Sequence, residues 1–253
     1  MSTDTLQPHL PWIESHTPLP PVENAWGKDT DAPGLLAAGA DLGVERLLEA
    51  YAKGVFPWYN PNQPVLWWSP DPRMVLRIQN FKLHRSLRKT LNRYSAQPNF
   101  QLSFDRAFDE VIEACAQSPR EGQNGTWIVP AMVSAYQDLH RAGFAHSAET
   151  WLDGELVAGL YFVSIGKAVF GESMFSTLTD GSKMALAALV HVCSQHGIQA
   201  IDCQQNTAHL ASMGAQEMSR SAFLAQSIPA MKEPSPDWKN AQIDWDLWRT
   251  SAL

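Results

Sequence analysis

Apolar residues recur with helical spacing in four stretches of the chain. In the first stretch, apolar side chains from Val44 to Tyr51 lie at positions i, i+3, i+4 and i+7, which predicts an amphipathic helix that Gly54 ends. The same spacing predicts three further helices. Their apolar stripes are Phe108, Val111, Ile112 and Cys115; Met132, Tyr136 and Leu139 behind Pro130; and Leu186, Leu189, Val190 and Cys193, which Gly197 follows.

A strand-rich stretch, residues 145–176, separates the third predicted helix from the fourth. Asp153-Gly154 is a two-residue hairpin signal between alternating segments, and Gly166-Lys167 indicates a second reversal, so the stretch predicts an antiparallel meander. Residues 198–204, IQAIDCQ, are typical of a short buried strand. The order of helices, meander, helix and strand predicts an α+β fold.

The amino-terminal part of the chain has a different character. Residues 1–40 are rich in Pro, Gly and Trp, and residues 56–73 read FPWYNPNQPVLWWSPDPR. Because proline lacks an amide hydrogen, we predict no regular structure in residues 56–73. The three tryptophans of this segment need burial or a stacking partner, and a packing loop between domains is the simplest interpretation.

Three polar residues interrupt the apolar strands. Because side chains alternate along a strand, Asp202 and Gln204 are predicted to share one face, as are Glu172 and Met174. A carboxylate among apolar neighbours is costly to desolvate unless it is hydrogen-bonded or meets a cation. Two interpretations follow: a site for an ammonium or guanidinium group, or an Asp202 that accepts hydrogen bonds from backbone amides at a strand end.

Charge is distributed unevenly over the 253 residues, whose net charge is −7. We define the basic window as residues 72–104, which hold no acidic residue and carry +7, so the rest of the chain carries −14. Such a segment is either a phosphate-binding surface or a solvated helix face. Its cations are Arg73, Arg77, Lys82, Arg85, Arg88, Lys89 and Arg93.

The sequence indicates no membrane segment, disulfide or metal site. The amino terminus lacks a basic region followed by an apolar run, and no stretch approaches the ~20 apolar residues of a membrane span, so we expect a cytoplasmic protein. Cys115, Cys193 and Cys203 are widely spaced, and the histidines show no metal-ligand spacing. We therefore expect reduced thiols and no bound metal.

Several motifs, taken together, resemble one family. They are GLLAAGADL (34–42), AYAKGVFPWY (50–59), LWWSPDPRMVL (66–76), GTWIVPAM (125–132), HRAGFAHSAETW (140–151), GESMFS (171–176), SKMAL (182–186) and IDCQ (201–204). In this order they are similar to the bacterial leucyl/phenylalanyl-tRNA–protein transferases. Ala158, Phe162 and Val169 depart from the family pattern and are expected to affect the shape of the amino-acid pocket more than the chemistry.

The resemblance implies a small amino-terminal domain, residues 1–71, and an acetyltransferase-like N-acyltransferase domain, residues 72–253, with a largely antiparallel sheet. It also implies transfer of Leu or Phe, and less well Met, from aminoacyl-tRNA to the amino-terminal Arg or Lys of acceptor proteins, which marks them for degradation. The ester is already activated, so no cofactor is expected. We expect a monomer.

The same resemblance assigns roles to individual residues. Asp202 and Gln204 would orient and help deprotonate the attacking amine, and Glu172 with Asp202 would attract the cationic acceptor side chain. The amino-acid pocket would be lined by Leu160, Met174, Leu186 and Ile201. The tRNA would be bound by Arg85, Arg88 and Lys89, with Trp58 and Trp127 stacking on the terminal adenosine.

Two other functions are compatible with parts of the pattern. An acetyl-CoA-dependent N-acetyltransferase would need a glycine-rich pyrophosphate loop before its helix, where this chain has only Gly181 and Ser182. A non-catalytic tRNA-binding protein would explain the basic window but not the paired carboxylates.

Overall fold

Two sheets and seven α-helices form the part of the chain that the computed structural model describes, residues 9–118 and 128–244. The small sheet has the order β1-β2-β4-β3, and the large sheet has the order β11-β5-β10-β9-β8-β7-β6. The small-sheet strands are β1 (Trp12–Ile13), β2 (Leu35–Gly39), β3 (Phe56–Pro57) and β4 (Leu66–Trp68). The large-sheet strands are β5 (Arg73–Arg77), β6 (Phe100–Phe104), β7 (Ala145–Leu152), β8 (Glu155–Ile165), β9 (Ala168–Ser176), β10 (Ala200–Gln204) and β11 (Gln216–Met218).

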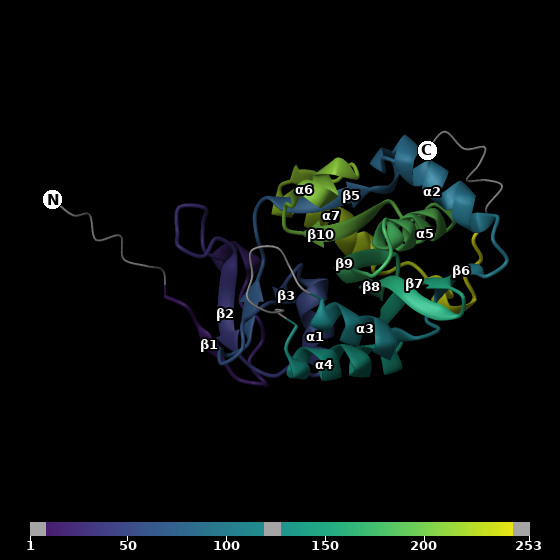
Figure 1. Cartoon of the computed structure of the whole chain (residues 1–253). Coiled ribbons are helices and arrows are strands. Elements are labelled where there is room, and N and C mark those ends of the chain that lie inside the picture. The colour runs from purple at the N-terminus through teal and green to yellow at the C-terminus, as the bar shows by residue number, and fades with distance from the viewer. Residues whose placement is uncertain (1–8, 119–127, 245–253) are drawn as a thin grey trace.

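Helices cover both faces of the large sheet, with α3 and α4 on one side and α5 and α2 on the other (Figure 1). The α-helices are α1 (Val44–Ala52), α2 (Arg85–Ser95), α3 (Phe108–Gln117), α4 (Pro130–Arg141), α5 (Gly181–Gln195), α6 (Ala208–Ser212) and α7 (Arg220–Ala230). Short 3₁₀ turns are η1 (Val22–Asn24), η2 (Ile78–Asn80) and η3 (Trp238–Asn240). None of the helices in the described residues is long and apolar enough to cross a bilayer.

Each face of the large sheet has its own hydrophobic core. The first core joins the small sheet, α1, α3 and α4 to one face of the large sheet. The second core lies on the opposite face, under α5 and α2. Because α1 and the small sheet share a core with the large sheet, the amino-terminal segment is packed as part of the main body; the division of the chain after Asp71 stays a prediction.

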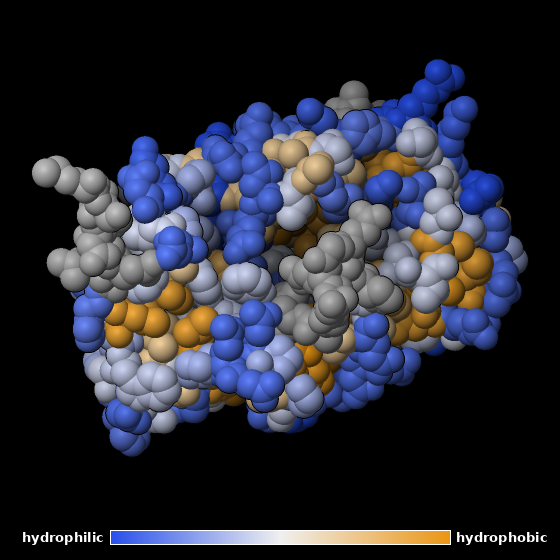
Figure 2. All heavy atoms as spheres, turned by 60° about the vertical axis from the view of Figure 1, so that its left-hand side comes forward, coloured by the Kyte–Doolittle hydropathy of each residue, from blue (hydrophilic) through white to orange (hydrophobic). Residues whose placement is uncertain are grey.

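Figure 2 shows hydrophilic side chains around an apolar hollow on one face.

The α+β prediction is confirmed, since all neighbouring strands of the large sheet are antiparallel except β9 and β10. The four predicted helices correspond to α1, α3, α4 and α5. The first predicted hairpin is also present: Asp153 and Gly154 join β7 to β8 with φ of 54° and 81°, the conformation that a two-residue hairpin turn requires.

The prediction that residues 56–73 lack regular structure is wrong. Strands β3 and β4 form within this segment, and Phe56 pairs with Trp68. The only proline in these strands is Pro57, and it lies in β3, at the edge of the small sheet. An edge strand has one side without a neighbour, so a missing amide hydrogen is tolerated there. Proline content therefore gave a wrong prediction for this segment, because it does not take into account where a strand lies within its sheet.

Candidate active site

The polar residues singled out in the sequence meet where β9 and β10, the parallel pair, lose their regular register. Ile201 pairs with Val169 and Asp202 pairs with Phe170, but the pairing does not continue beyond these residues. A register shift also lies between Asp202 and Gln204, where Gln204 has a φ of 62°. Such irregularities re-aim side chains and interrupt a ladder, which leaves room for a site between the two strands.

Glu172 is the centre of a hydrogen-bonded network from three elements. Its Oε1 accepts hydrogen bonds from the hydroxyl of Tyr51 on α1, at 2.7 Å, and from Nε2 of Gln204 on β10, at 3.0 Å. Its Oε2 accepts a hydrogen bond from the hydroxyl of Tyr136 on α4, at 3.3 Å. The carboxylate is thus held in one position by groups from both the amino-terminal and the central parts of the chain.

The pKa of the Glu172 carboxyl is raised to about 7, and burial is the main cause. Although part of the residue reaches the surface, the carboxylate itself is enclosed by the network. The negative charge of Asp202 raises the pKa further, whereas the hydrogen bonds from Tyr51, Gln204 and Tyr136 lower it. A carboxyl group with this pKa can both accept and release a proton near neutral pH.

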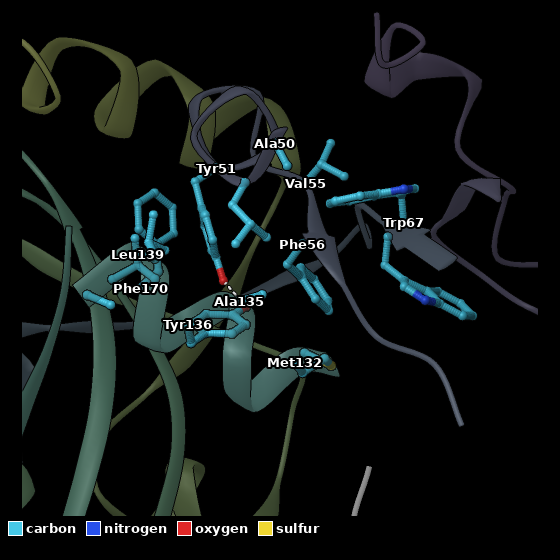
Figure 3. Close-up of a cluster of buried hydrophobic side chains, with 14 of the residues drawn as sticks. Ala50, Tyr51, Val55, Phe56, Trp67, Met132, Ala135, Tyr136, Leu139 and Phe170 are labelled. Atoms are coloured by element: carbon cyan, nitrogen blue, oxygen red, sulfur yellow. Dashed lines mark hydrogen bonds between the residues drawn. The ribbon is translucent and has the colours of Figure 1, made fainter. Parts of the chain in front are cut away.

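The Tyr51 and Tyr136 hydroxyl groups meet, and the single Tyr136 proton is shared between the Tyr51 oxygen and Glu172, because the Tyr51 proton is donated to Glu172. Phe170 lies beside Tyr51 (Figure 3). Burial raises the pKa of both phenols well above the usual value, and the negative charge of Glu172 adds to this effect. Both phenols therefore stay protonated and act as hydrogen-bond donors. The sequence placed these tyrosines on apolar helical stripes and missed their role; the available signal was that a buried Tyr hydroxyl requires a polar partner.

Asp202 forms a buried ion pair with Arg73, a residue 129 positions away. Arg73 Nε donates to Oδ1 at 2.9 Å and Nη2 donates to Oδ2 at 2.6 Å, while Nη1 donates to the Gly54 carbonyl oxygen at 3.1 Å. The guanidinium carbon lies 4.9 Å from the ring centroids of both Phe56 and Phe223. The Asp202 carboxylate thus has a cation from its own chain as partner.

This ion pair changes the interpretation of two residues. Arg73 was counted among the cations of the basic window, but it is 0% exposed and cannot form part of a phosphate-binding surface. Asp202 is 2% exposed and also accepts a hydrogen bond from the backbone amide of Gln204 at 2.9 Å. Asp202 thus combines features of both earlier interpretations: it has a cationic partner, and it serves a backbone amide at a strand end.

The prediction that Glu172 and Met174 share a face is wrong. Phe162 of β8 pairs with Gly171 and Tyr161 pairs with Ser173, so Glu172 is an extra residue in the register. This bulge shifts the alternation of β9. Glu172 therefore contacts the tyrosines of the first core, while Met174 packs against the second core and pairs with Leu160 across the strands.

The four residues expected to line the amino-acid pocket are brought together on one side of the large sheet. Leu160, Leu186 and Ile201 are buried members of the second core, and Met174 packs against it. They come from β8, α5, β10 and β9, respectively. Their assignment to a pocket stays a prediction.

The residues expected to bind tRNA are found in different settings. Arg85 and Lys89 are exposed on α2, whereas Arg88 is half-buried and its Nε has no hydrogen-bond partner among the described residues. Trp58 is half-buried and packs edge-on against Trp68, with ring centroids 5.4 Å apart. Trp127 lies outside the described residues.

One cluster of potential metal ligands lies elsewhere in the described residues, and it comprises Asp105, His140 and His146. His146 Nδ1 and Asp105 Oδ2 form a hydrogen bond of 2.7 Å, and His140 Nδ1 lies 2.7 Å from the Ala145 carbonyl oxygen. These bonds already occupy one nitrogen of each ring. The arrangement is that of a hydrogen-bonded Asp–His pair with a neighbouring histidine.

We expect Glu172 to make the stability of the protein depend on pH. Its folded-state pKa is about 7 and the ordinary value is 4.5, so the folded chain binds more protons between these values. This contribution to stability is fully present below pH 4.5 and is lost as the pH rises through about 7. Urea unfolding of the wild type and of Glu172→Gln across this range tests the prediction. The same pH dependence in both proteins would contradict it.

Comparison with known proteins connects this site to one family. The family model described as leucyl/phenylalanyl-tRNA protein transferase matches residues 75–227, and that of its N-terminal domain matches residues 40–71. A leucyl/phenylalanyl-tRNA--protein transferase from Polaromonas sp. is 56% identical over 236 residues, which are 93% of this chain and 92% of the relative. One from Albidiferax ferrireducens is 54% identical over 238 residues, 94% of each chain.

Solved structures show a more distant likeness. FemX has a TM-score of 0.42 and 11% identity, with 68% of this chain and 66% of FemX covered. The structure of L-PGS from Bacillus licheniformis has a TM-score of 0.37 and 12% identity, with 68% and 53% covered.

Proposed function

The chain belongs to the leucyl/phenylalanyl-tRNA protein transferase family, and we propose that it transfers Leu or Phe, and less well Met, from aminoacyl-tRNA to the amino terminus of an acceptor protein. The acceptor begins with Arg or Lys, and the transfer marks it for degradation. The enzyme acts as a cytoplasmic monomer. The observation that carries the proposal is the network around Glu172, which connects three elements of the chain to one carboxyl group.

The network supplies what aminolysis of an ester requires. An aminoacyl ester is already activated, and an α-amino group has a pKa of about 7.7–8.0, so a neutral fraction exists near pH 7. What remains is to position the amine and accept its proton. Glu172, whose pKa is raised to about 7, suits the role of proton acceptor. Asp202 is committed to Arg73, so we assign it to positioning the backbone of Gln204.

The same carboxyl group supports selection of a cationic acceptor. Glu172 attracts the Arg or Lys side chain of the acceptor, while Gln204 orients the amine. Asp202 contributes less to this attraction than the sequence alone implied, because its carboxylate is already paired with Arg73. Leu160, Met174, Leu186 and Ile201 receive the apolar side chain of the transferred amino acid. An apolar pocket separates similar side chains by only about 1–3 kcal/mol, which explains some transfer of Met.

The tRNA is bound through phosphate contacts. Exposed Arg85 and Lys89, with half-buried Arg88, lie on α2 and present positive charge on a chain that is otherwise acidic. Phosphate contacts position a nucleic acid without reading its sequence. Trp58 and Trp127 stack on the terminal adenosine.

One assay tests the proposed function. The purified protein is incubated with labelled leucyl-tRNA, or with labelled acetyl-CoA, and a peptide that begins with Arg. We expect label in the peptide only with leucyl-tRNA. Transfer from acetyl-CoA would indicate an N-acetyltransferase, and tRNA binding without transfer would indicate a non-catalytic tRNA-binding protein.

We expect the triple variant Arg85→Ala, Arg88→Ala, Lys89→Ala to bind tRNA more weakly and with a smaller salt dependence. Each phosphate contact contributes about 0.7–0.9 to the slope of log K against log salt, so three contacts contribute about 2–3. Binding is measured between low and moderate salt. Arg141→Ala, which alters an exposed cation on α4, serves as the control. An unchanged slope in the triple variant would mean that α2 is only a solvated helix.

A further inference from the structure

A cavity lies between α7 and the ends of β5, β9 and β10, and its volume is about 460 Å³. Of the site residues described above, its lining includes Asp202 but not Glu172, Gln204 or Tyr51. Sites for small ligands commonly have volumes of about 300–1,000 Å³. The cavity is therefore large enough for a small molecule and is distinct from the Glu172 network.

The inner wall of the cavity is apolar. Val75 and Phe223 line it, and the Phe223 ring packs nearly edge-on against the fully buried Phe170, with ring centroids 6.4 Å apart and planes at 81°. Ala200 on β10 and Ala225 on α7 line the cavity with small side chains from two elements. The wall suits an apolar body of moderate size.

Among the described residues that line the cavity, one cation has no partner. Lys167 forms an ion pair with Glu233 at 2.7 Å, and Asp202 is paired with Arg73. Arg77 also lines the cavity and is exposed, and its side chain makes no hydrogen bond or ion pair in residues 9–118 and 128–244. The cavity therefore combines an apolar wall with an available positive charge.

The turn between β8 and β9 fixes one end of the cavity. The amide of Lys167 donates to the Ala230 carbonyl oxygen at 2.9 Å. Gly166 is packed so closely against the end of α7 that a Cβ there would lie 2.5 Å from the Glu233 carbonyl oxygen and 2.6 Å from that of Met231. Glycine is thus required at this contact.

We propose that this cavity binds a small monocarboxylate with an apolar body. The carboxylate pairs with Arg77, and the apolar body lies against Phe223 and the small side chains of Ala200 and Ala225. This site does not depend on the proposed transfer reaction.

Calorimetric titration of the full chain with octanoate tests the proposal, with 1-octanol as the uncharged probe of the same length. We expect saturable binding of both probes. Arg77→Gln should weaken octanoate binding about 3- to 5-fold, the usual effect of one exposed charge pair, and leave octanol binding unchanged. The control Arg93→Gln alters an exposed cation on α2, away from the cavity, and should change neither.

Two further variants locate the bound probe. Ala200→Leu fills the cavity from β10, and Ala225→Phe fills it from the exposed surface of α7, where folding tolerates a larger side chain. Each variant should lower the binding affinity for both probes by more than about tenfold, because an overpacked site excludes a ligand. Thermal unfolding verifies that each variant is folded. Absence of octanoate binding up to about 10 mM would overturn the proposal. So would equal effects of the two arginine variants, or unchanged binding in the folded cavity-filling variants.

Discussion

Asp202→Asn is expected to lower the free energy of unfolding by about 3–5 kcal/mol, because it leaves the Arg73 guanidinium buried without its counter-ion. Arg73→Met should have a comparable effect, since it leaves the Asp202 carboxylate unpaired. The double variant should be more stable than the sum of the two single losses predicts, because no unpaired charge remains. Urea unfolding of all four proteins measures the coupling. Losses below about 1 kcal/mol in both single variants would contradict the buried ion pair.

The double variant also separates positioning from catalysis by Asp202. The amide oxygen that Asp202→Asn introduces can still accept the hydrogen bond from the Gln204 backbone amide, which the Asp202 carboxylate accepts at 2.9 Å in the wild type. If Asp202 only positions Gln204, single-turnover transfer from leucyl-tRNA by the folded double variant should stay within about tenfold of the wild type. A loss of about 10²–10⁴-fold in this folded variant would return a direct catalytic role to Asp202.

Glu172→Gln is expected to lower single-turnover transfer about 10²–10⁴-fold, because an amide cannot accept the proton of the attacking amine. The basic form of Glu172 is the active one, so the wild-type rate should rise as the pH passes through about 7. The rate of the variant should lack this rise, and its remaining pH dependence should reflect only the ionisation of the attacking amine, near pH 8. Glu155→Gln, an exposed change on β8, serves as the control.

Peptides that begin with Arg or with uncharged citrulline test the second role of Glu172. The variant should lose more activity with the Arg-initiated peptide, since only that peptide presents a cation to the carboxylate. Its tRNA affinity should be unchanged. An equal loss with both peptides would assign Glu172 to proton transfer alone, and near-normal transfer with both would exclude it from catalysis.

Elements that depend on neighbouring residues alone could be predicted from the amino-acid sequence. The helical stripes of α1, α3, α4 and α5 and the Asp153-Gly154 turn were predicted because helix periodicity and turn chemistry depend on residues only a few positions apart. It also singled out Glu172, Asp202 and Gln204, because polar groups within apolar strands require a partner.

The partners of these polar residues depend on how distant segments of the chain pack together. Tyr51 lies 121 positions from Glu172, and Arg73 lies 129 positions from Asp202, so no local pattern connects them. The bulge at Glu172 places Met174 on the opposite face of the sheet from the one that strand alternation predicted. Alternation predicts the face of a side chain only while the register between neighbouring strands is unbroken. Periodicity reports that a side chain is buried; the pairing of buried charges depends on how distant segments pack.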